Sequence, residues 1–350
     1  MKHKIVIDCR MIHYSGIGTY IKSVIPGLMD KINNCSFYLI VNYSVKYFLK
    51  NNNATLIKIE AKPYSIKEQF EIRNKIPKKI SLYWSPHYIN PLFLHANYLL
   101  TIHDLYHLNK TRNFFKRIYS YLYFSHIKFY QYNIIAVSNF TMNELVEFNF
   151  NPSNITVIHN GLPENFKDLK IKRKNFILTV GNMKKNKNIL RLVMAFESIQ
   201  DVIDLDLYIV GEYENIRDRD EEALNKIMIN DRIKLLGVLE KNMLEKYYNE
   251  AFFYIQPSIY EGFGYPPLEA MSCGCPVLSS NKGSLAEICR NAALYFDAYD
   301  YNDIALKMKD FIYNKDLYEE YIDRSKKNIE NYKLTTTINK TAELINSIIK

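Results

Sequence analysis

The sequence has no apolar stretch long enough to cross a membrane. A membrane-spanning helix needs about 18 or more consecutive apolar residues, and polar residues interrupt every hydrophobic run of this chain before that length. Asp8 also follows the first residue too closely for a signal peptide, which requires an apolar region before its cleavage site. The sequence therefore predicts a protein that acts in the cytoplasm.

Cysteine is scarce and irregularly spaced. The chain has five cysteines, an odd number, which argues against a disulfide scaffold and for a reducing compartment. Cys273 and Cys275 are separated by one glycine, but no second Cys or His pair has the spacing of a zinc site. Small residues are what a tight turn from a helix to a strand requires, so we expect no metal here.

Glycine is missing from one position where a dinucleotide-binding site would need it. A strand predicted at 4–9 leads into Ser15-Gly-Ile-Gly-Thr-Tyr20, which predicts a glycine turn before an amphipathic helix. The nicotinamide fingerprint has a third glycine or alanine three residues after Gly18, where this chain has Ile21. A nicotinamide enzyme is therefore disfavoured. The backbone amides of Gly16 and Gly18 could still bind a phosphate or an acceptor, or the segment could be a plain turn from strand to helix.

Hydrophobic residues and positive charge are both plentiful, but the charge is uneven. Of the 350 residues, 48% are hydrophobic, which is enough for two packed cores. Residues 1–165 carry 19 Lys and Arg against 9 Asp and Glu, whereas the remaining residues carry 27 against 28. The net charges are +10 and −1. The basic half is therefore the one expected to meet an anionic surface.

Short apolar runs alternate with amphipathic or polar segments, which is typical of parallel sheets with helical crossovers. In the first half, strands are predicted at 36–41, 55–59, 82–85, 98–102, 133–137 and 155–158. In the second half, they are predicted at 176–180, 205–210, 233–236, 252–255 and 276–279. The polar stretch 164–174 predicts a linker. We expect an N-terminal domain at 1–168, a second domain at 169–330, and a C-terminal helix at 331–350 that could pack back on the first domain.

The stretch 252–280 is the most informative part of the chain. Its apolar start predicts a buried strand, a glycine-containing loop follows, and Pro266 can begin a helix without losing a hydrogen bond. Glu261 falls in the loop and Glu269 in the first helical turn, so both could face one crevice at the carboxyl end of the strand. Two carboxylates suit neutral hydroxyls, while the helix start suits phosphate. A ligand with sugar and phosphate groups is the first hypothesis.

The segment from Glu261 to Val277 resembles the nucleotide-sugar motif of family 4 of the retaining glycosyltransferases. That motif reads E-G-F-G-x-P-x-x-E-A-M-x-x-G-x-P-V, and this chain matches it without a gap. The resemblance is strong over 175–297 and looser over 1–165. It implies an α/β fold of the GT-B class, with two facing Rossmann-like, doubly wound domains and the active site in the cleft between them.

The resemblance implies a site for the diphosphate of the donor in the second domain. Lys187, which is followed by asparagine as in the family, would hold the diphosphate, and Lys184 would stand in for the family's arginine. The helix start at Gly264, Tyr265 and Pro266 would add its positive end. The donor is a nucleotide-diphosphate sugar that serves as substrate. No cofactor and no metal are implied, because cationic side chains already supply the neutralisation that a metal would give.

The resemblance also implies contacts to the rest of the donor. Glu269 would bind the ribose hydroxyls, and Glu261 would bind hydroxyls of the sugar and orient its anomeric carbon. The backbone near Leu239 would bind the base. In the first domain, His103 follows a predicted strand and would lie close to the transferred sugar, although a lone histidine can equally be structural.

Residues 111–130 form a segment of unusual composition. It contains four basic and eight aromatic residues and no acidic one. Such a helix fits a membrane interface, where a lipid-linked acceptor would be found. A core helix with buried aromatics and a solvated basic rim fits the same pattern, and the sequence does not decide between the two.

The predicted function is transfer of a sugar to a saccharide or lipid-linked saccharide acceptor, in lipopolysaccharide O-antigen or capsule synthesis. Mannose is one candidate sugar, and the inner face of the cell membrane is the expected place. A nucleotide-sugar epimerase on the same architecture is one alternative. A basic protein that binds nucleic acid or membrane without catalysis is another, but it leaves the motif of the second domain unexplained, so no nucleic acid partner is expected.

Overall fold

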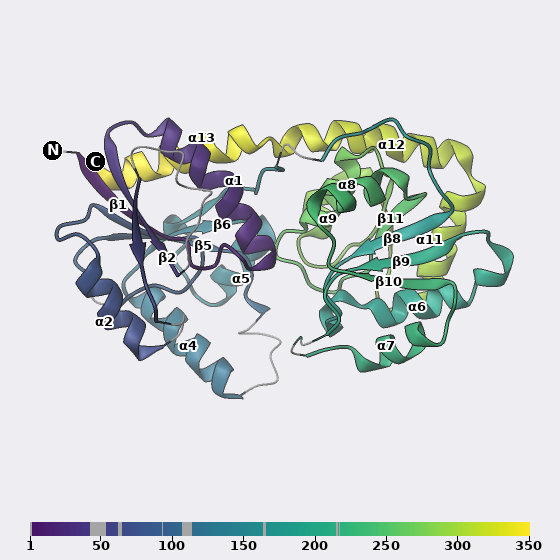
Figure 1. Ribbon diagram of the computed structural model, residues 1–350, viewed down its shortest axis with the longest axis horizontal. Coiled ribbons are helices and arrows are strands. Elements are labelled where there is room, and N and C mark those ends of the chain that lie inside the picture. Colours follow the sequence, from purple (N-terminus) through teal and green to yellow (C-terminus); the bar gives the residue numbers. More distant parts are fainter. Residues whose placement is uncertain are drawn as a thin grey trace. The chain divides into compact units, whose positions relative to one another are not determined.

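The computed structural model describes residues 2–42, 54–61, 65–92, 94–106, 114–163, 166–214, 216 and 218–350. The chain forms two compact units, each built on one sheet (Figure 1). The first unit comprises Met1–Pro163 and Lys333–Lys350, and the second comprises Glu164–Tyr332. The chain therefore leaves the first unit once and returns to it.

The first unit holds a seven-stranded parallel sheet with the order β3-β2-β1-β4-β5-β6-β7. Its strands are β1 (His3–Asp8), β2 (Cys35–Val41), β3 (Ala54–Lys58), β4 (Leu82–Ser85), β5 (Asn97–Ile102), β6 (Asn133–Ala136) and β7 (Ile155–Val157). The central strands are apolar and almost fully buried. This burial is expected because helices cover both faces of a parallel sheet.

The helices of the first unit come from both ends of the chain. Among the described residues they are α1 (Ser15–Lys31), α2 (Ile66–Lys75), α4 (Phe114–Phe129), α5 (Asn139–Glu147) and α13 (Leu334–Ile349). Helices α1 and α13 pack side by side (Figure 1). A Cβ on Gly27 of α1 would lie 2.5 Å from Ile338 Cδ1 of α13, so glycine permits this close approach. The last helix is thus an integral part of the first unit.

The second unit holds a six-stranded parallel sheet with the order β10-β9-β8-β11-β12-β13. Its strands are β8 (Phe176–Val180), β9 (Asp206–Val210), β10 (Ile233–Gly237), β11 (Phe253–Gln256), β12 (Val277–Ser280) and β13 (Ala293–Phe296). One face carries α6 (Ile189–Glu197), α7 (Glu221–Met228) and α11 (Tyr301–Tyr313). The other carries α8 (Lys241–Glu250), α9 (Tyr265–Ser272) and α12 (Lys315–Ile329) (Figure 1). The short helix α10 (Leu285–Cys289) follows β12.

Each sheet reverses its strand order at one point. The reversal lies between β1 and β4 in the first unit and between β8 and β11 in the second. Open α/β sheets bind ligands outside the carboxyl ends of their strands at such a point. The loops that leave β8 and β11 are therefore the expected place for a ligand in the second unit.

The predicted architecture of two Rossmann-like units is confirmed, and each predicted strand is found within one residue of its predicted bounds. The sequence missed β13 and the helices α2 and α7.

The interpretation of the glycine segment was wrong in one respect. Helix α1 begins at Ser15, so Gly16 and Gly18 lie in its first turn rather than in a turn before it. A Cβ on Gly18 would lie 2.3 Å from Ile12 O, so close packing against the preceding loop requires glycine there.

The polar stretch after Pro163 is fastened to the second unit. Leu169 N donates a hydrogen bond to Asn249 Oδ1 at 2.7 Å. Arg173 Nη1 donates to the carbonyl oxygens of Tyr248 and Asn249 at 2.8 and 2.6 Å. These carbonyls lie at the C-terminal end of α8, where a cation is favourable. The stretch therefore fixes the end of α8.

Candidate active site

An ion pair joins the two loops at the switch point of the second sheet. Lys187 Nζ, in the loop after β8, lies 2.6 Å from Glu261 Oε1, in the loop after β11. The two side chains keep 20% and 13% of their surface exposed, so the pair is accessible from solvent yet partly shielded from it. The structure thus brings together two residues that the sequence marks for donor binding.

Among the described residues, Glu261 is held through one of its two carboxylate oxygens. Oε1 accepts hydrogen bonds from Lys187 Nζ at 2.6 Å, from Ser258 Oγ at 2.7 Å and from Gln256 Nε2 at 3.1 Å. No donor within the described part of the chain reaches Oε2. The carboxylate is therefore fixed in place, and Oε2 can accept a hydrogen bond from a ligand hydroxyl.

The direction of Lys187 depends on the residue after it. Asn188 has φ 56° and ψ 32°, a left-handed conformation that asparagine tolerates better than most residues. Its Nδ2 donates to Pro257 O at 3.0 Å and to Ala298 O at 2.7 Å. These bonds tie the turn after β8 to the loops after β11 and β13, and so aim Lys187 at Glu261.

Helix α9 begins directly after the loop that carries Glu261. Gly264 precedes the helix with φ 96° and ψ 70°, a backbone conformation that glycine adopts readily. Tyr265 is the first helical residue, and Pro266 follows within the first turn, where a missing N–H costs no intrahelical bond. The predicted helix start is confirmed. Its positive end lies at the carboxyl edge of the sheet, as an anion site requires.

Glu269 is a buried carboxyl group on α9. Only 9% of the residue is exposed, and Oε2 accepts a hydrogen bond of 2.9 Å from Tyr248 OH. Burial raises the pKa of Glu269 to about 7, although the bond from Tyr248 and the charge of Lys241 act to lower it. The two motif glutamates therefore differ: Glu261 is paired with a cation, and Glu269 is held by a neutral hydroxyl.

Lys184 and Leu239, the other two predicted donor residues, also follow strands of the second sheet. Lys184 forms a backbone bridge with Arg219, and within the described residues it makes no ion pair with Glu261. Leu239 is partly exposed and comes shortly after β10. Lys187, rather than Lys184, is thus the cation at the glutamate.

The five cysteines lie in the interiors of the two units. All five are free and buried, and burial raises the pKa of Cys275 to about 12, so that it remains a neutral thiol. Across the residues that the structure describes, no group of three or more His, Cys, Asp or Glu side chains could hold a metal ion.

His103 follows β5 at the carboxyl edge of the first sheet. Its Nε2 lies 3.1 Å from Pro86 O, and its ring packs edge-on against Tyr20 with the centroids 5.2 Å apart. Part of the residue is exposed, yet burial of the ring lowers its pKa to about 4, against the bond to Pro86. The ring is therefore neutral at pH 7. Because a carbonyl only accepts, Nε2 carries the proton, and Nδ1 can accept a hydrogen bond from a hydroxyl.

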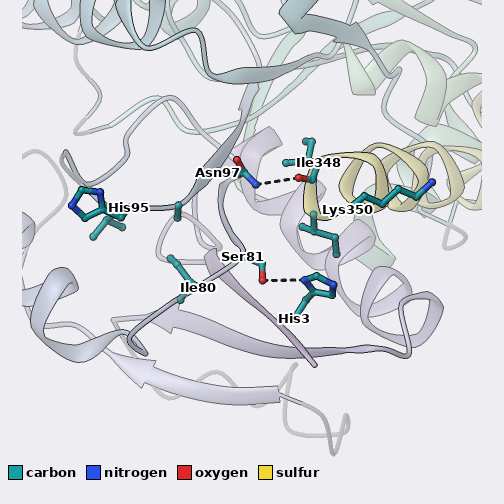
Figure 2. A pocket seen from close by; sticks show the side chains of 10 residues that line it. His3, Ile80, Ser81, His95, Asn97, Ile348 and Lys350 are labelled. Carbon is teal, nitrogen blue, oxygen red and sulfur yellow. Dashed lines mark hydrogen bonds between the residues drawn. The ribbon is translucent and has the colours of Figure 1, made fainter. Parts of the chain in front are cut away.

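A hollow of about 720 Å³ lies at the opposite edge of the first sheet (Figure 2). It is lined by residues at the amino ends of β1 and β5 and by the end of α13, among them His3 and Asn97. His3 Nδ1 lies 3.1 Å from Ser81 Oγ, and Asn97 Nδ2 donates to Ile348 O at 3.0 Å. The hollow is far along the strands from His103, and none of the predicted site residues lines it.

Sequence reasoning missed the residues that support the two glutamates. Ser258 precedes Glu261 by three residues, and Gln256 ends β11. Because both are close to Glu261 in the sequence, they could have been predicted as its neighbours. Tyr248 could not, because it lies on another helix. Ser284 was also missed: its N and Oγ both donate to Glu261 O at 3.0 Å and so hold the backbone of the loop.

Comparison with a solved structure supports the architecture described here. A structure of HepE from Anabaena in complex with UDP-glucose aligns with a TM-score of 0.77 at 14% sequence identity, covering 98% of this chain and 99% of that one. At this identity the likeness concerns the fold alone. The predicted GT-B fold of two Rossmann-like units is confirmed.

Two family models match neighbouring parts of the chain. Residues 163–328 match the model for glycosyl transferases group 1, and residues 76–166 match the model for glycosyltransferase family 4. The two matches together cover residues 76–328, so the predicted resemblance to glycosyltransferase family 4 is confirmed. The first match covers the Lys187–Glu261 pair and α9.

Curated relatives are similar over part of their length. The O-antigen chain mannosyltransferase RfbU of Salmonella typhimurium is 26% identical over 61% of this chain and 60% of its own length. The O-antigen chain mannosyltransferase B of Escherichia coli is 28% identical over 49% of this chain and 49% of its own length. The matched part thus spans about half to three fifths of these relatives.

Proposed function

We propose that this protein is a retaining glycosyltransferase that moves a sugar from a nucleotide-diphosphate sugar to a saccharide or lipid-linked saccharide. The ion pair between Lys187 and Glu261, at the switch point of the second sheet, is the observation that carries the proposal. A cation suited to phosphate and a carboxylate suited to hydroxyls stand side by side, as a sugar phosphate requires. The family match over the same residues supports this assignment.

The geometry of the pair suits simultaneous contact with both parts of the donor. An ammonium group has three N–H donors. One of those on Lys187 is used by Glu261, which leaves the other two for phosphate oxygens. In the proposed reaction, Lys187 and the start of α9 stabilise the charge that develops on the diphosphate as the sugar–phosphate bond breaks. Glu261 Oε2 accepts from sugar hydroxyls and orients the anomeric carbon, and the leaving phosphate takes the acceptor's proton.

Mannose is the sugar that the curated relatives favour, because the two compared above are named as O-antigen mannosyltransferases. The proposed product is therefore a mannosylated lipopolysaccharide O-antigen or capsule precursor. Glu269 takes the ribose hydroxyls in this proposal, and the backbone near Leu239 takes the base. His103 Nδ1 accepts from a hydroxyl of the transferred sugar.

Calorimetric titration with UDP, GDP and ADP tests donor binding. We expect heat of binding with one nucleotide, because the base restricts which nucleotide sugars can be donors. The sugar conjugates of that nucleotide are then incubated with saccharide acceptors, and the products are analysed by mass spectrometry. A new glycosidic bond supports transfer. An altered sugar without such a bond favours an epimerase instead, and a flat titration with all three nucleotides contradicts the whole proposal.

We further propose that α4 contacts the anionic inner face of the cell membrane, where a lipid-linked acceptor would lie. Residues 111–113 and the side chains of 114–120 lie outside the described residues. In the rest of the helix, Tyr123 and Phe124 are buried, whereas Leu122 and Phe129 are 63% and 78% exposed. Tyr130, which directly follows the helix, is 51% exposed. Exposed aromatic and apolar side chains on a basic unit suit an anionic membrane interface. No described helix is both long enough and apolar enough to span a membrane.

Replacing Phe129 and Tyr130 together by serine is expected to weaken binding to phosphatidylglycerol vesicles about tenfold or more, because each ring loses apolar burial in the interface. Cosedimentation measures the bound fraction. The control is Ile229→Ser, which removes an apolar side chain that is 84% exposed on the second unit. Equal vesicle binding by the wild type and the double variant would contradict the membrane contact.

A further inference from the structure

A buried tyrosine hydroxyl holds the second motif glutamate. Tyr248, on α8, is fully buried, and its OH donates to Glu269 Oε2 on α9 at 2.9 Å. The bond joins neighbouring helices on one face of the sheet. Neither residue type is needed to pack two helices together, and a buried carboxyl group is costly unless it serves a purpose or is well paired. Packing of the two helices therefore does not explain this contact.

The two oxygens of Glu269 have different surroundings. Oε2 accepts from Tyr248, whereas Oε1 receives no hydrogen bond from any described residue. Glu261 is arranged in the same way, with Oε1 anchored by three donors. In both carboxyl groups the protein holds one oxygen and leaves the other to a ligand. For Glu269, the anchoring donor is Tyr248.

Tyr248 is itself rigidly fixed. Its ring packs edge-on against Phe166 and at a tilt against Tyr254, with centroid distances of 5.7 Å in both cases. Its carbonyl oxygen accepts from Arg173 Nη1 at 2.8 Å. Burial raises the pKa of Tyr248 well above its usual value, and the charge of Glu269 raises it further. The hydroxyl therefore stays protonated and remains a donor over the whole working pH range.

Proton binding to Glu269 competes with ligand binding. The titratable groups that face the carboxyl group are Tyr248 and Lys241 on α8, Tyr254 on β11 and Cys273 at the end of α9. Burial raises the pKa of Glu269 to about 7, and of these groups Tyr248 and Lys241 lower it. With Oε2 already accepting from Tyr248, a proton would sit on Oε1. It would turn the ligand-facing acceptor into a donor.

We propose that Tyr248 is a positioning residue for the nucleotide: its hydroxyl holds Glu269 ionised, with Oε1 directed at the hydroxyls of the ribose. This inference rests on the proposed function, because it assumes that Glu269 binds the ribose. The tyrosine does not touch the ligand. It sets the pH range over which the glutamate can accept a ribose hydroxyl, so nucleotide affinity is high above about pH 7 and falls as the pH is lowered below it.

The test compares Tyr248→Phe with Tyr247→Phe. Tyr247 is the neighbouring residue on α8, and its ring packs against Phe176 of β8 and Tyr208 of β9. Affinity for the nucleotide identified by calorimetry is measured from pH 5.5 to pH 9. In Tyr248→Phe, the midpoint of the pH dependence is expected to move up by about one pH unit, because a hydrogen bond to the charged form is lost. Tyr247→Phe should keep the wild-type midpoint, and Glu269→Gln should lose the pH dependence.

A second measurement, made without ligand, separates the inference about Tyr248 from the proposed function. The infrared band of the protonated carboxyl group, identified by its absence in Glu269→Gln, is followed against pH in the wild type and in Tyr248→Phe. An upward shift in both the infrared and the binding titrations supports the inference. Nucleotide binding with one midpoint for the wild type and Tyr248→Phe overturns the role of Tyr248 and leaves the proposed function standing. A shifted infrared titration in a protein that binds no nucleotide overturns the proposed function, and with it the nucleotide role of Tyr248.

Discussion

Replacing Lys187 by alanine is expected to reduce sugar transfer by about 10²–10³-fold, mainly in kcat, while the fold is retained. The lysine is the cation at the switch point, and its Nζ is 2.6 Å from Glu261. In the proposed reaction, it stabilises charge that develops on the diphosphate only as the sugar–phosphate bond breaks, so its loss acts on the transition state more than on donor binding. Initial rates of transfer, measured over a range of donor concentrations, separate the two effects.

Lys185→Ala is the matched control, because Lys185 lies in the same turn with an exposed side chain. Like Lys187→Ala, this variant removes one positive charge near the edge of the sheet, but it leaves the ion pair between Lys187 and Glu261 intact. We expect it to retain nearly full activity. Glu261→Ala should also lose transfer, and the double variant of Lys187 and Glu261 should lose little more than either single variant, because the pair acts as a unit. Full activity in both single variants would contradict the proposed site.

Gly283→Ala is expected to destabilise the second unit by about 2–4 kcal/mol and to reduce transfer about 10²-fold. Gly283 has φ 61°, and a Cβ there would lie 2.6 Å from Glu261 O and 2.7 Å from Glu261 N. These are backbone atoms, which cannot turn aside as a side chain would. Ser284, the next residue, donates to Glu261 O. The methyl group would therefore push the glutamate away from Lys187.

Gly274→Ala separates the backbone strain from the effect on the site. Gly274 has a similar φ of 66°, but its Cβ would meet the side chain of Asp168, with Oδ2 at 2.9 Å, which can move. We expect a loss of about 1 kcal/mol and nearly normal transfer. Circular dichroism follows unfolding of the whole chain. The single tryptophan, Trp84, is buried in β4, so its fluorescence reports on the first unit and should be unchanged in both variants. Equal activity in Gly283→Ala and Gly274→Ala would contradict the role assigned to Gly283.

The sequence predicted the sheets better than the helices, for a physical reason. Strands that are buried on both faces read as apolar runs, and such runs are visible without knowledge of the rest of the fold. Helix α2 has no comparable signal. It is mostly polar, and its Glu68 is buried in an ion pair of 2.7 Å with Arg10, a residue 58 positions away. Helix α7 had a local signal that was overlooked, because Asp220 caps it and two glutamates follow.

In the candidate site, too, local features could be predicted from the sequence, whereas contacts between distant residues could not. The motif from Glu261 to Val277 is local, so the sequence could mark both glutamates and the start of α9. The partner of each glutamate comes from elsewhere in the chain: Lys187 is 74 positions from Glu261, and Tyr248 is 21 positions from Glu269. A family resemblance pointed to Lys187. Nothing in the sequence pointed to Tyr248, because only packing of α8 against α9 brings its hydroxyl to the carboxyl group.

The return of α13 to the first unit makes the second unit an insertion within the first. Leu162 and Lys333 form a backbone bridge where the chain leaves and comes back, and a Cβ on Gly161 would lie 2.3 Å from Leu334 Cα. On the ribosome, the inserted unit can fold as soon as it emerges, whereas the surrounding unit must wait for its last helix. Residues 164–350 must be made before the first unit is complete, which takes roughly 10–40 s at usual rates of synthesis. During that time the apolar face of α1 is uncovered, so the half of the protein made first is the half completed last.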